Sequence, residues 1–343
     1  MKSRKLLLLI ITPAIVLALA GAFIIFSFYG PHVKSFTPRS LVFIPDSSEY
    51  SAAMDSVEKN LIIGNTRVFK WLARKKHYPA LVKPGKYVFS GSLSYIKLIN
   101  ILRSGRQATV KITFSNIRTL NEIAGRAGGK IEADSLQILE FITNPDNFKV
   151  DGFTKENVIS VFIPDTYEFF WNTSANGFYS RMLREYHKFW NRDRLAKAGE
   201  KNLTPVEVSI LASIIDDEVS KPDEKARIAG VYLNRLKRGI PLQACPTIKY
   251  ALNDFTITRV LKKYLDVDSP YNTYRHKGFP PGPIGCPSAE SIDAVLNAEK
   301  SDFLYFAAKA DFSGYHNFSR TLAEHNRYAE QYQRELDKRK IYR

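Results

Sequence analysis

Three consecutive acids, Asp216, Asp217 and Glu218, end an apolar run in the stretch LASIIDDE. On a helix of 3.6 residues per turn, Glu218 lies four residues after Ile214 and three after Ile215, so it extends the apolar stripe. Burial disfavours the charged form of a carboxyl and lets it donate a proton near neutral pH. A Glu218 held against these neighbours could act as a general acid, and Asp217 would then be its solvated neighbour. The alternative is that Glu218 only pairs with a nearby cation.

The helix that carries these acids has a clear start. Thr204 can cap it, Pro205 suits the first helical position, and Glu207 completes a T-x-x-E capping box. Upstream, Val158–Trp171 is strand-like and aromatic, and Ala175–Ala198 has the pattern of one long amphipathic helix. Strands and helices without regular alternation predict an α+β catalytic domain, which we place at residues 108–343.

A smaller unit precedes this domain, at residues 38–107. Its pattern predicts a strand at Ser40–Pro45, helices at Ser47–Asn60 and Thr66–Lys76, and a strand at Lys83–Phe89. This β-α-α-β order resembles the LysM arrangement, which recognises N-acetylglucosamine polymers. A plain spacer is the alternative.

The N-terminus predicts a membrane anchor. Leu6–Tyr29 contains no charged residue and is long enough to cross the roughly 30 Å hydrocarbon layer as a helix. The basic residues of the tail at 1–5 would stay in the cytoplasm. We therefore expect a single-pass protein of the bacterial inner membrane with residues 30–343 on the extracytoplasmic side; the alternative is a cleaved signal peptide.

Composition narrows the choice of partners. The 343 residues carry a net charge of +16, which suits an anionic polymer or a membrane surface. No arginine-rich arm or finger motif occurs, and the main part of the chain is expected outside the cytoplasm, so we expect no nucleic-acid partner. The two cysteines have no metal-binding spacing, and we expect neither a metal nor a cofactor.

Three later segments are rich in amides, hydroxyls, aromatic rings, proline and glycine. They are VYLNRLKRGIPLQACPTIKYAL (231–252), SPYNTYRHKGFPPGPIGCPSAESIDA (269–294) and FLYFAAKADFSGYHNFSRTLAEHN (303–326), the last with the pattern of a hairpin entering a helix. Such loops suit a sugar cleft, because rings stack on sugar faces and amides bind hydroxyls. From the residues alone, the prediction is a carbohydrate or peptide cleft.

Taken in order, these segments resemble the YceG/MltG family of membrane-anchored endolytic murein transglycosylases. The matching pieces are PGKYVF, FIPDTYEF, LASIIDDE, VYLNRLKRGIPLQACPT, YNTY, GFPPGPI, FLYFAA and HNFSRTLAEHN. The resemblance implies a LysM-like subdomain beside the membrane and an α+β catalytic domain. It also implies cleavage of the β-1,4 bond from N-acetylmuramic acid to N-acetylglucosamine in nascent peptidoglycan. The products would carry 1,6-anhydromuramyl ends, glycan elongation would be terminated, and cell-wall synthases would be partners.

The resemblance also assigns residues. The family's Glu-x-Glu motif maps its catalytic second Glu onto Glu218, while its first Glu is Asp216 here. Glycan binding and orientation of Glu218 would fall to Gln243, Thr247, Asn272, Thr273, Tyr274, His316, His325 and Asn326. Cys245 replaces a family Asp, and Cys286 stands after PPGPI where another residue type is usual. Because both lie in motif loops, we predict that they form a disulfide.

The residues leave three other functions open. One is a non-catalytic peptidoglycan-binding scaffold for cell-wall synthases. A second is a true muramidase that uses water. A third is a cysteine hydrolase with Cys245 as nucleophile and His316 or His325 as base, although Pro246 directly follows the cysteine.

Overall fold

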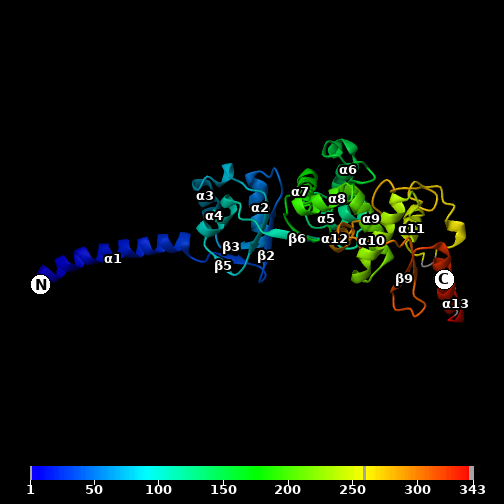
Figure 1. Ribbon diagram of the computed structural model, residues 1–343. Coiled ribbons are helices and arrows are strands. Elements are labelled where there is room, and N and C mark those ends of the chain that lie inside the picture. Colours follow the sequence, from blue (N-terminus) through cyan, green and yellow to red (C-terminus); the bar gives the residue numbers. More distant parts are fainter. Residues whose placement is uncertain (1, 258–259, 340–343) are drawn as a thin grey trace. The chain divides into compact units, whose positions relative to one another are not determined.

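Residues 2–257 and 260–339 are described by the structure, a computed structural model that divides into two units (Figure 1). The first unit is Met1–Lys111 with two short returns, Lys130–Ala133 and Glu168–Ser174, and the remainder forms the second. The sequence instead suggested one boundary between residues 107 and 108. Strands β6 (Thr109–Thr113) and β7 (Thr166–Phe170) pair, and each runs from one unit into the other.

The first unit begins with helix α1 (Lys2–Tyr29), of which Ile11–Tyr29 is long and apolar enough to cross a membrane. Its remaining elements are β1 (Val33–Ser35), β2 (Ser40–Ile44), α2 (Tyr50–Asn60), β3 (Leu61–Ile63), α3 (Thr66–Lys75), the 3₁₀ helix η1 (Tyr78–Ala80), β4 (Gly85–Phe89), β5 (Ser92–Leu93) and α4 (Tyr95–Ser104).

The core of the first unit lies where β2 and β4 pair antiparallel, with Val42 opposite Tyr87. Residues on both strands alternate between buried and partly exposed, as expected when one face of a sheet is covered. The predicted strand–helix–helix–strand order is present, and the short β3 is inserted between the two helices. The likeness to LysM stays a prediction.

The second unit is mainly helical. Its helices are α5 (Leu120–Gly128), α6 (Ser135–Thr143), α7 (Ala175–Phe189), α8 (Arg192–Glu200), α9 (Pro205–Glu218), α10 (Pro222–Lys237), α11 (Cys245–Ala251), α12 (Ala289–Leu296) and α13 (Leu322–Lys338). Short 3₁₀ helices are η2 (Pro145–Asn147), η3 (Lys149–Asp151), η4 (Val158–Val161) and η5 (Lys262–Tyr264). Strands β8 (Tyr305–Ala308) and β9 (His316–Ser319) form the predicted hairpin, and α13 follows it.

Two sequence expectations in this unit were wrong in detail. The strand expected at Val158–Trp171 begins only at Thr166, because η4 occupies its first part. The single long helix expected at Ala175–Ala198 is two helices, α7 and α8. The Asn191 side chain accepts a hydrogen bond from the Arg194 amide and so caps a new helix there.

Helix α9 is the centre of the second unit. It contacts α8, α10, α11 and α12, and every residue from Val208 to Ile215 is buried (Figure 1). The predicted capping box is present, since the Thr204 and Glu207 side chains each bind the backbone of the other. A helix buried on all sides has little freedom to shift, so the acids at its C-terminal end are held in place.

Candidate active site

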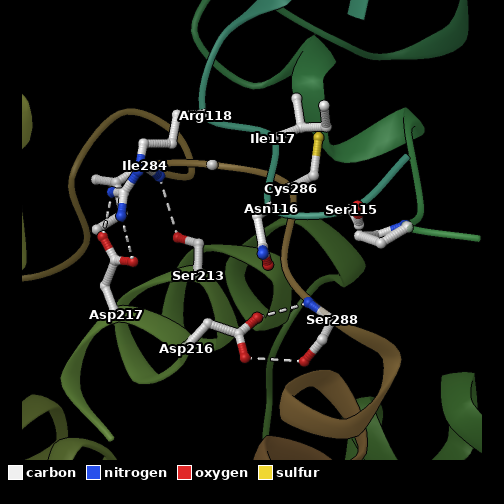
Figure 2. A pocket seen from close by; sticks show the side chains of 12 residues that line it. Ser115, Asn116, Ile117, Arg118, Ser213, Asp216, Asp217, Ile284, Cys286 and Ser288 are labelled. Atoms are coloured by element: carbon white, nitrogen blue, oxygen red, sulfur yellow. Dashed lines mark hydrogen bonds and ion pairs between the residues drawn. The ribbon is translucent and has the colours of Figure 1, made fainter. Parts of the chain in front are cut away.

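The three acids at the end of α9 point in different directions, because successive helical residues are rotated by about 100°. Each carboxyl therefore meets a different set of neighbours. Asp216 and Asp217 line a cavity shown in Figure 2, and Glu218 does not. The sequence separated Glu218 from the other two acids only by its helical phase, whereas the structure shows the partners of each carboxyl.

Asp216 holds the start of α12. Its Oδ2 accepts a hydrogen bond from the Ser288 amide (2.6 Å), and its Oδ1 accepts bonds from the hydroxyls of Ser288 (2.8 Å) and Ser291 (2.5 Å). The buried ammonium of Lys225 lies 3.2 Å from the same Oδ1 and 2.6 Å from Oε2 of Glu290. Asp216 is thus a structural acid whose oxygens are occupied.

Asp217 is exposed, as the sequence suggested, and it also has an ion-pair partner. The guanidinium of Arg118 donates to both of its oxygens, with Nη2 2.9 Å from Oδ1. The same guanidinium stacks over the ring of Phe255 at 4.5 Å. Arg118 thereby neutralises the acid next to Glu218, a pairing that the sequence did not predict because the two residues lie 99 positions apart.

Glu218 has the surroundings of a proton donor. Its side chain is half-buried, and within residues 2–257 and 260–339 its carboxyl has no hydrogen-bond partner. Burial raises the pKa of Glu218 to about 7; Asp217 adds to this rise and Lys249 opposes it. The carboxyl is therefore protonated for much of the time near neutral pH, as a general acid requires.

A cluster of polar groups, one buried and two partly buried, faces Glu218. Tyr232 on α10, Cys245 on α11 and Tyr274 all interact electrostatically with its carboxyl. Burial is the main cause that raises the pKa of both tyrosines, so both hydroxyls stay protonated and can donate hydrogen bonds.

Gln243 is presented beside this cluster in a fixed orientation. Its backbone has φ of 53°, and its backbone amide donates a hydrogen bond to the Thr273 carbonyl at 3.0 Å. The buried Arg235 donates to its Oε1 at 2.5 Å, and also to the carbonyls of Pro241 and Leu304. With Oε1 occupied, the exposed Gln243 presents its Nε2 donors outward. The sequence motif VYLNRLKRG contained Arg235, but its role was not predicted.

A model of the YceG-like family matches residues 42–331.

The chain belongs to the YceG-like family.

An endolytic murein transglycosylase of Bacillus subtilis (strain 168) is 30% identical over 306 residues, covering 84% of this chain and 83% of that protein. One of Streptococcus pneumoniae serotype 2 is 27% identical over 77% of this chain, which spans about half of its length (53%). The crystal structure of a YceG-like protein from Listeria monocytogenes aligns with a TM-score of 0.55 at 28% identity. The alignment covers 84% of this chain and 98% of that one.

Three other predicted binding residues of this YceG-like chain are buried. Thr247 and Asn272 have no exposed surface, and Thr273 is 2% exposed. The two threonine hydroxyls bind each other at 2.9 Å, and the Asn272 amide donates to the carbonyls of Leu265 and Val267 at 2.8 Å. Their polar groups are thus used within the protein, so we reassign them from substrate binding to positioning of the loops.

The three C-terminal motif residues of the YceG-like chain each have different neighbours. The buried Glu224 orients His316. Glu224 Oε1 accepts a hydrogen bond from the His316 backbone amide (3.0 Å), and Glu224 Oε2 lies 2.8 Å from Nδ1 of the ring. His325 stacks on Tyr305, and burial followed by the charge of Arg235 lowers its pKa. Asn326 is exposed on α13, where it lines another cavity with Lys262, Ala329, Glu330, Gln333, Arg334 and Asp337.

Both cysteines of the YceG-like chain are free thiols, so the predicted disulfide is absent. Cys245 Sγ lies 3.1 Å from the Tyr274 hydroxyl, whereas the buried Cys286 Sγ lies 3.9 Å from the Ile159 carbonyl. The two sulfur atoms therefore have different neighbours and do not contact each other as a bonded pair would. Burial and Glu218 raise the pKa of Cys245, which disfavours the thiolate that a cysteine hydrolase needs.

Proposed function

We propose that this YceG-like chain is an endolytic murein transglycosylase. It would cleave the β-1,4 bond from N-acetylmuramic acid to N-acetylglucosamine in nascent peptidoglycan, leave 1,6-anhydromuramyl ends and terminate glycan elongation. The relatives named for this activity support the class of reaction. The observation that carries it in this chain is Glu218, whose pKa is raised to about 7 beside two acids that are already occupied.

One carboxyl suffices for this chemistry. Protonated Glu218 gives its proton to the glycosidic oxygen, and the bond from that oxygen to the muramyl C1 breaks. The resulting carboxylate takes the proton of the muramyl C6 hydroxyl, whose oxygen bonds to C1 and closes the anhydro ring. The proton returns to Glu218 and no water is consumed. Hydrolysis by an inverting enzyme would instead need a second free carboxylate, and Asp216 and Asp217 are both engaged.

Donors around Glu218 would hold the glycan. We assign the outward Nε2 of Gln243 and the hydroxyl of Tyr274 to sugar hydroxyls or acetamido oxygens, with Arg235 as a positioning residue. His316, His325 and Asn326 are proposed contacts farther along the strand. The loops behind these groups are braced by buried hydroxyls and amides, which suits recognition of a polymer in a fixed register.

The location of the reaction is part of the proposal. Helix α1 would anchor the chain in the bacterial inner membrane by a single pass, with the enzyme on the extracytoplasmic side, where peptidoglycan is built. Residues 38–107 would act as a LysM-like glycan-binding unit, and cell-wall synthases would be partners of the anchored enzyme.

The test is an analysis of products. The purified full chain in detergent is incubated with un-crosslinked peptidoglycan, and the new ends are identified by mass spectrometry. We expect anhydromuramyl ends from the native protein and none from Glu218→Gln. Reducing ends would instead identify a muramidase, and binding without cleavage a scaffold; either result would replace the proposal.

A further inference from the structure

The cavity beside the end of α9 has no part in the chemistry described above. It has a volume of about 490 Å³, within the range of roughly 300–1,000 Å³ that small-ligand sites span. It lies entirely in the second unit and is lined by Ser115, Asn116, Ile117, Arg118, Pro164, Ser213, Asp216, Asp217, Ile284, Gly285, Cys286 and Ser288.

The walls of this cavity are held by backbone and side-chain bonds. The Cys286 amide donates to the Ile117 carbonyl at 2.8 Å, and the Ile284 amide donates to the Ser213 hydroxyl at 3.0 Å. A Cβ at Gly285 would lie 2.9 Å from the Ile117 carbonyl oxygen, so this position requires glycine. The GFPPGPI motif therefore leads into a fixed wall of the cavity.

The charges in the wall are already balanced. Arg118 neutralises Asp217, as Figure 2 shows. Lys225 neutralises Asp216. A charged ligand would have to break one of these pairs, which costs more than binding a neutral polar one. The lining therefore favours a neutral ligand that forms hydrogen bonds.

Asn116 supplies the group that would bind this ligand. Figure 2 shows its amide directed into the cavity, and no described residue forms a hydrogen bond with it. Its backbone has φ of 51°, a left-handed conformation that asparagine tolerates better than most residues. A side-chain amide offers both a donor and an acceptor, which is the complement of another amide.

We propose that this cavity is a subsite for one N-acetylglucosamine ring of the glycan strand, with Asn116 binding its acetamido group. The proposal rests on the proposed function for the class of polymer, and it adds a place where the strand is held next to the catalytic helix end. The ring is neutral and carries one amide, which matches the balanced charges and the unpartnered Asn116.

The test measures binding separately from cleavage. The full chain carrying Glu218→Gln, in detergent, is titrated by NMR with the β-1,4 tetramer of N-acetylglucosamine and with the β-1,4 tetramer of glucose, which lacks the acetamido groups. Asn116→Gly preserves the left-handed backbone and removes only the amide. We expect it to weaken binding of the acetylated tetramer about tenfold, the effect of losing one or two hydrogen bonds, and to leave the glucose tetramer unaffected.

Asn202→Gly is the matched control, because Asn202 is also exposed with a positive φ of 55° but lies outside the cavity. Unchanged binding in Asn116→Gly, an equal loss for both tetramers, or no binding of the acetylated tetramer would each overturn the subsite. The subsite would also be overturned if a free stem peptide displaced the tetramer from the protein with Asn116 but not from the Asn116→Gly variant. Anhydromuramyl ends from an enzyme whose Asn116→Gly variant binds normally would remove the subsite and leave the proposed function intact.

Discussion

The guanidinium of Arg118 donates hydrogen bonds to both carboxylate oxygens of Asp217, the residue that directly precedes Glu218, the proposed catalytic acid. A cation that is distant in the sequence thus balances the charge beside the proposed proton donor. The other groups that face Glu218 are Lys249 and Cys245 on α11, Tyr232 on α10, and Tyr274. Of these, Lys249 is the charged group, so the Arg118–Asp217 pair and Lys249 together set the field at the carboxyl.

This pair predicts opposite shifts in the pH dependence of cleavage. Glu218 must be protonated to start the reaction, so activity should fall as pH rises through its pKa of about 7. Asp217→Asn removes a negative charge that raises this pKa and should move the alkaline limb to lower pH. Arg118→Ala exposes that charge and should move the limb to higher pH. Each shift should be several tenths of a pH unit in pH–rate profiles.

The double variant Arg118→Ala/Asp217→Asn provides the control for this prediction. Its alkaline limb should return close to that of the native enzyme, because both charges are absent. Shifts in the same direction for the two single variants would contradict electrostatic control by the pair and indicate a structural effect of either residue.

Glu218→Gln should reduce cleavage by a factor of about 10²–10⁴, the usual contribution of a general acid. The same change should make the fold more stable at pH 8. The native carboxyl has a pKa of about 7 when folded, above its unfolded value, so stability falls as pH rises between about 4.5 and 7. Allowing for partial exposure, glutamine should recover on the order of 1–2 kcal/mol at pH 8. Thermal melts at pH 5 and pH 8 measure this, and an equal pH dependence in both proteins would contradict it.

Asp216→Ala should destabilise the second unit by about 2–4 kcal/mol. It removes the acceptor for Ser288 and Ser291 and leaves the buried Lys225 with Glu290 alone. Urea denaturation measures the loss. Asp217→Ala is the matched comparison, since its pair with Arg118 is more exposed and should contribute at most about 1 kcal/mol. Equal losses of unfolding free energy in the two variants would show that Asp216 does not stabilise α12 more than an exposed ion pair would.

Gln243→Gly should weaken glycan binding about 5- to 20-fold through the loss of an oriented amide. Stability should stay level or fall by about 1–2 kcal/mol, because glycine accepts the φ of 53° without strain but leaves the buried Arg235 without one of its acceptors. The KM for glycan strands and the melting temperature are measured together. A loss of stability with unchanged KM would instead assign Gln243 to the fold.

The free cysteines predict that reductant has no effect. Protein denatured without reductant should take up two alkyl groups by mass spectrometry, at Cys245 and Cys286. Its melting temperature should be the same with and without a thiol reagent. If no alkyl groups were taken up before reduction, the disulfide that the sequence suggested would be present after all.

The sequence by itself determined the features that depend on local periodicity. The cap at Thr204 sets the phase of α9, and counting from it places Glu218 on the apolar side. The order of elements in the first unit and the hairpin before α13 were also predicted, because alternating and helical patterns are local properties.

Only the tertiary structure decided what each polar group contacts. Arg118 reaches Asp217 across 99 residues, and Ser288 reaches Asp216 across 72. Asn272 and Thr273 look in sequence like cleft residues, yet both are buried. The Asn272 side chain donates to the Leu265 carbonyl, and the Thr273 hydroxyl accepts from the Ala244 amide. The physical reason is that partners distant in sequence meet only when helices pack, and no local pattern records the direction in which a loop turns its side chains.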